Sequence, residues 1–254
     1  MAAAAPVHLD TSRGHFQLRR YPARPNEPLQ AWCGADLLLL EAWSSRGIDP
    51  AATLVVNDEH GALSTIIEPA ALWTDSALAA KAASENLRRN HRAQVPVVWS
   101  TRLPPPGMQL VLLRIPKQLA YFEHQLAVLQ SVLPQGAELL CAGMDKHLSP
   151  QTAKVLERYF GPVARHRGAR KARVFSARAG AIPARPVPPP ASYHCLQLDA
   201  ELRGSANVFS RDSLDMGSRF LMEQLAQCSP VASLADLACG NGVLGLYAHR
   251  LGPV

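Results

Sequence analysis

Short apolar runs alternate with longer segments in which apolar residues recur every three or four positions, and this pattern occupies residues 53–176. Apolar, β-branched runs bounded by turn residues predict strands, and the longer periodic segments predict helices. The predicted strands are Thr53–Val56, Ala71–Thr74, Val95–Trp99, Leu110–Arg114, Glu138–Ala142 and Ala172–Ser176, and the predicted helices are Ala77–Arg89, Leu119–Leu133 and Gln151–Tyr159. Strands that alternate with helices predict an α/β fold with a doubly wound, parallel sheet.

The pattern changes after residue 176. Residues 177–190 are rich in proline, which cannot donate a ladder hydrogen bond and stiffens the chain, so this segment is expected to be an interdomain linker. Beyond it the pattern predicts a hairpin over Tyr193–Arg203, a helix over Leu214–Gln227, a strand over Val231–Leu234 and a helix from Val243. The expected organisation is a first domain over 1–176, the linker over 177–190 and the start of a second domain over 191–254.

Composition favours a packed protein, because 48% of the 254 residues are hydrophobic and 18% are charged. The five cysteines are odd in number and widely spaced, without a Cys-x-x-Cys pair, so neither a disulfide framework nor a metal site is expected. The first six residues lack the pattern of a signal peptide, and no apolar run is long enough for a membrane span. We therefore expect a cytoplasmic protein without membrane or metal partners.

The formal net charge is +6, and part of it is concentrated in one stretch. This stretch, here called the basic cluster, contains Arg165, Arg167, Arg170, Lys171 and Arg173. A second group comprises Arg88, Arg89 and Arg92. Clustered arginines are typical of surfaces that bind a phosphate backbone, although a solvated basic face has the same composition.

The segment Asp236–Gly245 carries the most specific chemistry of the chain. It follows the strand predicted over Val231–Leu234 and contains Gly240 and Gly242, whose backbones can adopt positive φ and let a ligand lie against them. The spacing Gly-x-Gly-x-x-Gly matches the dinucleotide fingerprint, but Asp236 would face a pyrophosphate and suits a cationic ligand better. The alternative is a glycine turn that only joins a strand to a helix.

The string Asp-Leu-x-Cys-Gly-x-Gly-x-x-Gly resembles motif I of the class I S-adenosylmethionine-dependent methyltransferases. The segments Asn207–Leu221, Asn26–Trp32 with Asp36, and Val56–Leu63 resemble the bacterial 23S ribosomal RNA guanine-N2 methyltransferase G family, which has two tandem methyltransferase-like domains. The resemblance implies a Rossmann-like fold, S-adenosylmethionine as cofactor, 23S ribosomal RNA as partner, and methyl transfer to the exocyclic amine of a guanine. It also implies that Asp236, Gly240, Asn241 and Gly242 contact the cofactor. One departure is Ala238, where the family usually has glycine.

The first domain is expected to be a degenerate copy of the second. Its first turn, Asn57–Gly61, has one glycine, and its carboxylates Asp58 and Asp75 are better explained as turn formers or helix caps than as ligands. In the resembled family a strand of the active domain ends in Asn-Pro-Pro-aromatic, whereas the corresponding stretch here is Arg114–Lys117, whose cations could hold phosphate but cannot accept a hydrogen bond from an amino group. This domain is therefore predicted to bind and support RNA.

The chain stops nine residues after Gly245 and contains no Asn-Pro-Pro-aromatic motif. We expect a fragment of a longer methyltransferase, monomeric, without catalytic residues of its own and inactive as given. Completion of the second domain by another chain is the alternative. Two other functions remain open from the sequence: a non-catalytic RNA-binding protein, and a nucleotide-dependent oxidoreductase that would rest on the glycine spacing alone.

Overall fold

The structure is a computed structural model that describes residues 6–229 and 231–252, and the chain divides into two compact units, one up to Pro186 and one from Val187. No described helix is long and apolar enough to cross a membrane.

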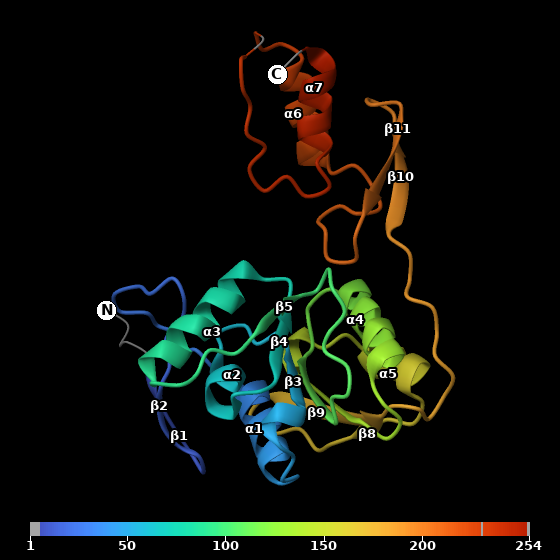
Figure 1. Ribbon diagram of the computed structural model, residues 1–254. Coiled ribbons are helices and arrows are strands. Elements are labelled where there is room, and N and C mark those ends of the chain that lie inside the picture. Colours follow the sequence, from blue (N-terminus) through green and yellow to red (C-terminus); the bar gives the residue numbers. More distant parts are fainter. Residues whose placement is uncertain (1–5, 230, 253–254) are drawn as a thin grey trace. The chain divides into compact units, whose positions relative to one another are not determined.

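A mostly parallel, seven-stranded sheet organises the first unit (Figure 1). In spatial order its strands are β5 (Val97–Trp99), β4 (Ala71–Thr74), β3 (Thr53–Val56), β6 (Leu110–Arg114), β7 (Glu138–Met144), β9 (Ala172–Arg178) and β8 (Ala164–Arg165). The strands from β5 to β7 are parallel, which confirms the predicted doubly wound α/β arrangement.

The strand over Ala172–Ser176 was expected to be parallel, and this expectation is wrong, because β9 runs antiparallel to β7. The reason is strand β8, which has only two residues and is too short to produce a recognisable apolar pattern. The chain passes from β7 through a helix to β8 at the sheet edge, and a tight loop then returns it as β9 between β7 and β8. A hairpin necessarily pairs its two strands antiparallel.

Helices cover both faces of this sheet (Figure 1). The helices are α1 (Gly34–Ser44), α2 (Ala62–Ile67), α3 (Ala77–Arg89), α4 (Leu119–Val132) and α5 (Thr152–Phe160). Side chains alternate along a strand, so Leu54 and Val56 pack on the face of α4 and α5, whereas Val55 packs with α1 and α2 on the other. All three side chains are fully buried, and the sheet therefore contributes to two cores.

An N-terminal hairpin, which the sequence pattern did not predict, lies on the α3 side of the unit. It consists of β1 (His8–Thr11) and β2 (Gly14–Gln17). Asn90 exchanges hydrogen bonds with the backbone of Gln17 at 2.8 Å, and Asn86 does the same with the backbone of Arg19 at 2.9 Å. Two amide side chains, Asn86 on α3 and Asn90 at its C-cap, thus fix the exit of the hairpin and the chain that follows it.

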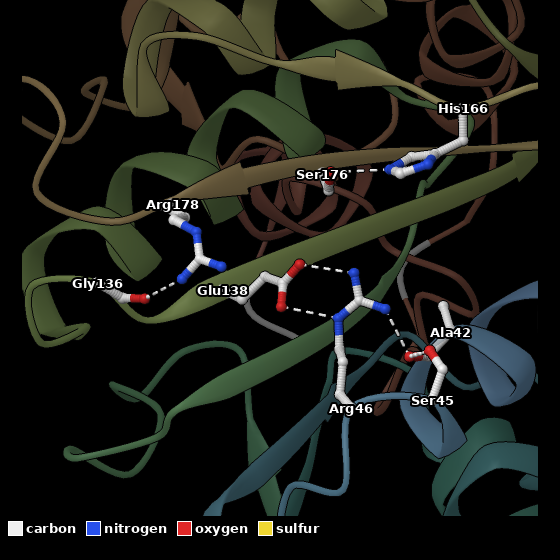
Figure 2. Close-up of polar contacts among 8 residues, drawn as sticks. All are labelled: Ala42, Ser45, Arg46, Gly136, Glu138, His166, Ser176 and Arg178. Atoms are coloured by element: carbon white, nitrogen blue, oxygen red, sulfur yellow. Dashed lines mark hydrogen bonds and ion pairs between the residues drawn. The ribbon is translucent and has the colours of Figure 1, made fainter.

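A bidentate ion pair joins the end of α1 to the start of β7 (Figure 2). Arg46 donates to both carboxylate oxygens of Glu138, at 2.6 and 2.7 Å, and its third nitrogen donates to the carbonyl of Ala42 at 2.6 Å. These hydrogen bonds hold the pKa of Glu138 below its usual range. Both side chains are largely buried, which makes the pair a fixed link between helix and sheet.

Arg46→Ala is expected to lower the free energy of unfolding by about 2 kcal/mol, between the values typical of exposed and of buried ion pairs. The cost arises because Glu138 loses its countercharge while it stays largely shielded from water. Urea denaturation followed by circular dichroism measures it. Lys81→Ala, which removes one partner of an exposed pair with Glu85, should leave the stability nearly unchanged. Equal effects of the two substitutions would contradict the structural role of Arg46.

Part of the proline-rich segment 177–190 is held against the first unit. Strand β9 continues to Arg178, and the side-chain amide of Gln130 on α4 donates to the carbonyl of Pro183 at 3.1 Å and accepts from the amide of Arg185 at 2.9 Å. The change of unit falls at Pro186, within this segment.

The second unit contains the antiparallel hairpin of β10 (Ala191–Cys195) and β11 (Ala200–Gly204), and the helices α6 (Met216–Leu225) and α7 (Val243–Leu251). These match the predicted hairpin and helices. The strand expected over Val231–Leu234 is not formed, because the two strands described in this unit pair only with each other and offer it no ladder. The core is correspondingly small, built around Cys195, Leu202 and Met222.

Candidate functional site

In the first unit the strand order changes direction between β3 and β6, and open α/β sheets generally bind ligands at such a point. Here the crevice is occupied by the protein's own amides. Asn57, at the end of β3 with a φ of 59°, donates to the carbonyl of Arg114 at 3.0 Å and exchanges hydrogen bonds of 2.9 Å with the side chain of Gln125. The three residues close the switch point with a hydrogen-bonded bridge between β3, β6 and α4.

Arg114 was expected to be able to hold phosphate, but the structure buries it. Its guanidinium pairs with the carboxylate of Asp36 on α1, and the side chains are 13% and 5% exposed. Burial opposes the charged form, yet the Asp36 carboxylate outweighs it, so the pKa of Arg114 lies above its ordinary value. The second oxygen of Asp36 accepts from the amide of Cys33 at 2.8 Å and caps α1. Arg114 is therefore a structural cation.

Asp58 is a helix cap, as the sequence indicated. It is fully buried, and its carboxylate accepts from the amide of Ser64 in the first turn of α2 at 2.7 Å. Burial, with a smaller contribution from Asp36, raises the pKa of Asp58 to about 6. Asp75 is not the cap of α3, because the hydroxyl of Ser76 takes that role by accepting from Ala79 at 3.2 Å.

The first turn of this unit is also closed by packing. A Cβ at Gly61, which has a φ of 77°, would lie 2.3 Å from Cα of Ala83 on α3. The glycine is required for the contact between α2 and α3 and leaves no space for a ligand. Together with the amide bridge and the buried ion pair, this makes the first unit an α/β scaffold whose crevice is filled.

The glycine-rich turn of the second unit has a different geometry. Gly240 and Gly242 have φ values of 58° and 80°, and Ala238, the departure noted in the sequence, adopts a φ of 61°. A Cβ at Gly242 would meet nothing within 4 Å, and one at Gly240 would meet only the carbonyl of Phe209 at 3.7 Å. The backbone is thus left-handed at Ala238, Gly240 and Gly242 and open to a ligand at the two glycines. Ala238 occupies a conformation that favours glycine, which is the residue the family usually has there.

Two polar side chains organise this turn. Asp236 accepts from the amide of Gly245 at 3.0 Å through one oxygen and caps α7, while its other oxygen makes no hydrogen bond within the described residues. Asn241 donates to the hydroxyl of Tyr193 at 3.0 Å and accepts from the amide of Val243 at 3.3 Å. A free carboxylate oxygen beside open glycine backbone fits a ligand that carries an ammonium group and hydroxyls.

The basic cluster is exposed, but three of its side chains have acidic partners. Arg165 pairs with Glu157 at 3.2 Å, Arg170 with Glu41 at 2.8 Å and Arg173 with Asp145 at 3.6 Å. Over the described ranges Arg167 and Lys171 form no ion pair. The sequence could not show the partner of Arg170, because Glu41 lies 129 residues away from it.

No group of three or more histidine, cysteine, aspartate or glutamate side chains in residues 6–229 and 231–252 is arranged to hold a metal ion. The chemistry that the described residues offer is therefore a glycine-rich turn with a free carboxylate oxygen, and exposed arginines.

Two family descriptions match the chain: RLMG N-terminal domain over residues 6–181 and methyltransferase small domain over residues 199–254. Relatives named ribosomal RNA large subunit methyltransferase G are 40% identical in Pseudomonas syringae pv. syringae and 39% identical in Stutzerimonas stutzeri. These alignments cover 91% and 94% of this chain, and the chain spans 63% and 65% of the relatives' length.

Among solved structures, RsmC of T. thermophilus, a 16S rRNA N2 methyltransferase in complex with AdoMet and guanosine, matches with a TM-score of 0.59 and 18% identity. The match covers 89% of this chain and 59% of RsmC, and at this identity it shows a shared fold. The sheet order, the filled crevice and the sequence matches have one explanation: the chain belongs to the ribosomal RNA large subunit methyltransferase G family.

Proposed function

We propose that this chain takes part in the S-adenosylmethionine-dependent methylation of a guanine N2 in 23S ribosomal RNA. The observation that carries the proposal is the turn from Asp236 to Gly245, whose left-handed glycines and free carboxylate oxygen suit the methionine ammonium and ribose of this cofactor. The name of the relatives supports the ribosomal RNA substrate. Asp236, Gly240, Asn241 and Gly242 are the proposed cofactor-binding residues. When bound, the cofactor would supply an electrophilic methyl group.

The proposed roles are divided between the domains. The first, over residues 1–176, supports and binds RNA, and the second, from residue 191, carries the cofactor turn. No catalytic residue is assigned within the 254 residues, because the described crevice of the first unit is filled and no Asn-Pro-Pro-aromatic motif occurs in the sequence. We place the protein in the cytoplasm and propose that it acts as a monomer.

For RNA, we propose the basic cluster of Arg165, Arg167, Arg170, Lys171 and Arg173 as one contact surface. Its side chains are exposed, and Arg167 and Lys171 have no acidic partner in the described parts of the chain. A phosphate backbone would be recognised through its charge, and base identity would matter little at such a surface.

Non-catalytic RNA binding is the second candidate function. It is favoured by the exposure of the cofactor turn, in which Leu237 is 95% exposed and no strand forms before Asp236. An oxidoreductase is the weakest alternative, since Asp236 would repel a pyrophosphate.

The 254-residue chain is expected to bind S-adenosylmethionine weakly, because the turn lacks the ladder that would fix it, and Gly240→Val should weaken this binding about tenfold further. A branched side chain at positive φ costs about 1 to 3 kcal/mol of strain, and about 1.4 kcal/mol within this range already corresponds to a factor of ten in affinity. Isothermal titration calorimetry with S-adenosylhomocysteine, and in parallel with a nicotinamide dinucleotide, measures both effects.

Gly252→Val is the matched control, since Gly252 belongs to the same unit, has an extended φ of 172° and would place its Cβ at least 4 Å from any other atom that could obstruct it. This variant should bind like the parent. Preference for the dinucleotide would favour the oxidoreductase, and identical cofactor binding by Gly240→Val and the parent would remove the turn as the cofactor site.

A further inference from the structure

A cavity of about 320 Å³ lies between residues 6–7 and the chain that leaves the N-terminal hairpin, residues 18–31. Its lining includes three arginines, Arg19, Arg20 and Arg24, and we refer to it as the arginine pocket. Neither the glycine-rich turn nor the basic cluster contributes to it. The pocket is therefore a separate concave surface of the first unit.

The positive charges at this pocket lack acidic partners. Arg19 and Arg24 form no ion pair in residues 6–229 and 231–252, and Arg20 donates to the uncharged nitrogen Nε2 of His60 at 3.0 Å. Glu27 lines the same cavity, but its carboxylate accepts from the amide of Leu29 at 3.2 Å and pairs with none of the arginines. Neighbouring like charges without counterions raise the local positive potential, and a bound anion would relieve it.

Arg89 on α3 extends this unbalanced charge. Its guanidinium donates to the amide oxygen of Asn86 at 2.5 Å, a neutral partner. Burial and the nearby Arg19 lower the pKa of Arg89 from its ordinary value. His60 is half-buried, and burial also lowers its pKa, so this imidazole adds no charge at neutral pH but keeps Arg20 in place.

The pocket is held on a fixed frame. Asn86 binds the backbone of Arg19 and also donates to the carbonyl of His60 at 2.8 Å, so one buried amide connects α3, the turn after β3 and the pocket wall. Arg19 therefore projects from a backbone held by two hydrogen bonds, and an arginine on fixed backbone loses less freedom when it binds an anion. The basic cluster differs from the pocket in its charge balance, because three of its five side chains already form ion pairs with acidic residues.

We propose that the arginine pocket is a binding site for the phosphodiester backbone of structured RNA, with Arg19 and Arg24 as the main phosphate contacts. The inference rests on the proposed role in ribosomal RNA modification and adds a defined surface to it. RNA is the occupant because three arginines without an acidic partner in the described residues line the pocket, and their guanidinium groups match the charge and geometry of phosphate oxygens.

The test compares two variants that lose the same net charge. Arg19→Ala with Arg24→Ala removes two exposed arginines of the pocket that make no side-chain hydrogen bond in the described residues, so the fold should persist. Arg165→Ala with Arg170→Ala removes two exposed arginines of the basic cluster that are paired with acids. Fluorescence anisotropy with a labelled hairpin RNA from the large subunit, over a series of salt concentrations, gives the affinity and its salt slope for the 254-residue chain.

The pocket variant should lose about tenfold in affinity near 0.1 M salt, and its salt slope should flatten by about 1.4 to 1.8, from 0.7 to 0.9 per phosphate contact. The cluster variant should lose clearly less. Arg19→Lys with Arg24→Lys should keep the slope of the parent, because lysine retains the charge. Circular dichroism melting of each variant confirms that the fold is intact.

Each other outcome is decisive. Parent-like affinity and slope for the pocket variant, with weaker binding by the cluster variant, would overturn the pocket and leave the proposed function standing. Flattening in the lysine variant as strong as in the alanine variant would also overturn it, since charge would not be the cause. A parent chain that binds no RNA even at low salt would instead remove RNA binding from the proposed function, and the pocket as an RNA site with it.

Discussion

Arg114→Ala is expected to lower the free energy of unfolding by about 3 to 5 kcal/mol, the range observed when one partner of a buried ion pair is removed. The carboxylate of Asp36 is 5% exposed, so the substitution leaves a negative charge where water cannot reach it. The loss should be evident from chemical denaturation at neutral pH. It would also show that Arg114 stabilises the filled crevice and is not a phosphate ligand.

A double variant separates the pair from its surroundings. Asp36→Asn with Arg114→Met removes both charges, and the asparagine oxygen can still accept from the amide of Cys33. More than half of the lost stability should return, because the uncompensated charge is the main cost. Arg158→Ala, which breaks a half-exposed pair with Glu123, should cost far less. A loss below about 1 kcal/mol for Arg114→Ala would contradict the buried pair as a main stabilising contact.

The sequence predicted those elements whose apolar pattern is long and clearly bounded. Helix α3 and strand β6 have the predicted bounds, and β3 and β4 do as well. Strand β8 has only two residues, and each strand of the N-terminal hairpin carries a single large apolar residue, whereas β3 and β4 are almost wholly apolar. The orientation of β9 depended on β8, so missing the short strand also misplaced the longer one.

The candidate site was predictable where its geometry is local. The glycines and the acid of the turn are ten residues or fewer apart, and the positive φ values of Gly240 and Gly242 follow from glycine itself. The strand expected over Val231–Leu234 did not form, because a strand needs a neighbour that local sequence does not supply. An apolar run alone is therefore not sufficient to predict a strand.

Contacts between distant residues were beyond the sequence pattern. Asp36 and Arg114 are 78 residues apart, and nothing near either one indicates the other. The same holds for Glu41, which pairs with Arg170 of the basic cluster across 129 residues, and for Arg89 on α3, which lies near Arg19 of the arginine pocket. A run of basic residues in a sequence indicates a candidate anion-binding surface. Only the fold shows which of these residues are free of ion pairs and available to bind an anion.

Asp58→Asn is expected to make the protein more stable above pH 7, by up to about 3 kcal/mol. The pKa of Asp58 is raised from 3.8 to about 6, chiefly by burial and further by Asp36, with the hydrogen bond from Ser64 acting in the opposite direction. One pKa unit corresponds to about 1.4 kcal/mol. A carboxyl group that holds its proton more tightly in the folded state contributes stability below the unfolded pKa, and this contribution is lost as the pH rises through the folded pKa.

The advantage of Asp58→Asn should therefore be small at pH 4, grow between pH 4 and pH 6, and stay constant above pH 7. Asparagine keeps an oxygen that can accept from the amide of Ser64, so the cap of α2 is retained. Thermal or urea unfolding of parent and variant at a series of pH values measures the difference. Asp49→Asn is the control, because Asp49 caps the turn Pro50–Ala52 from an exposed position, and burial is the cause of the expected effect. A stability difference that is the same at pH 4.5 and pH 8 would show that Asp58 does not bear a buried charge in the folded protein.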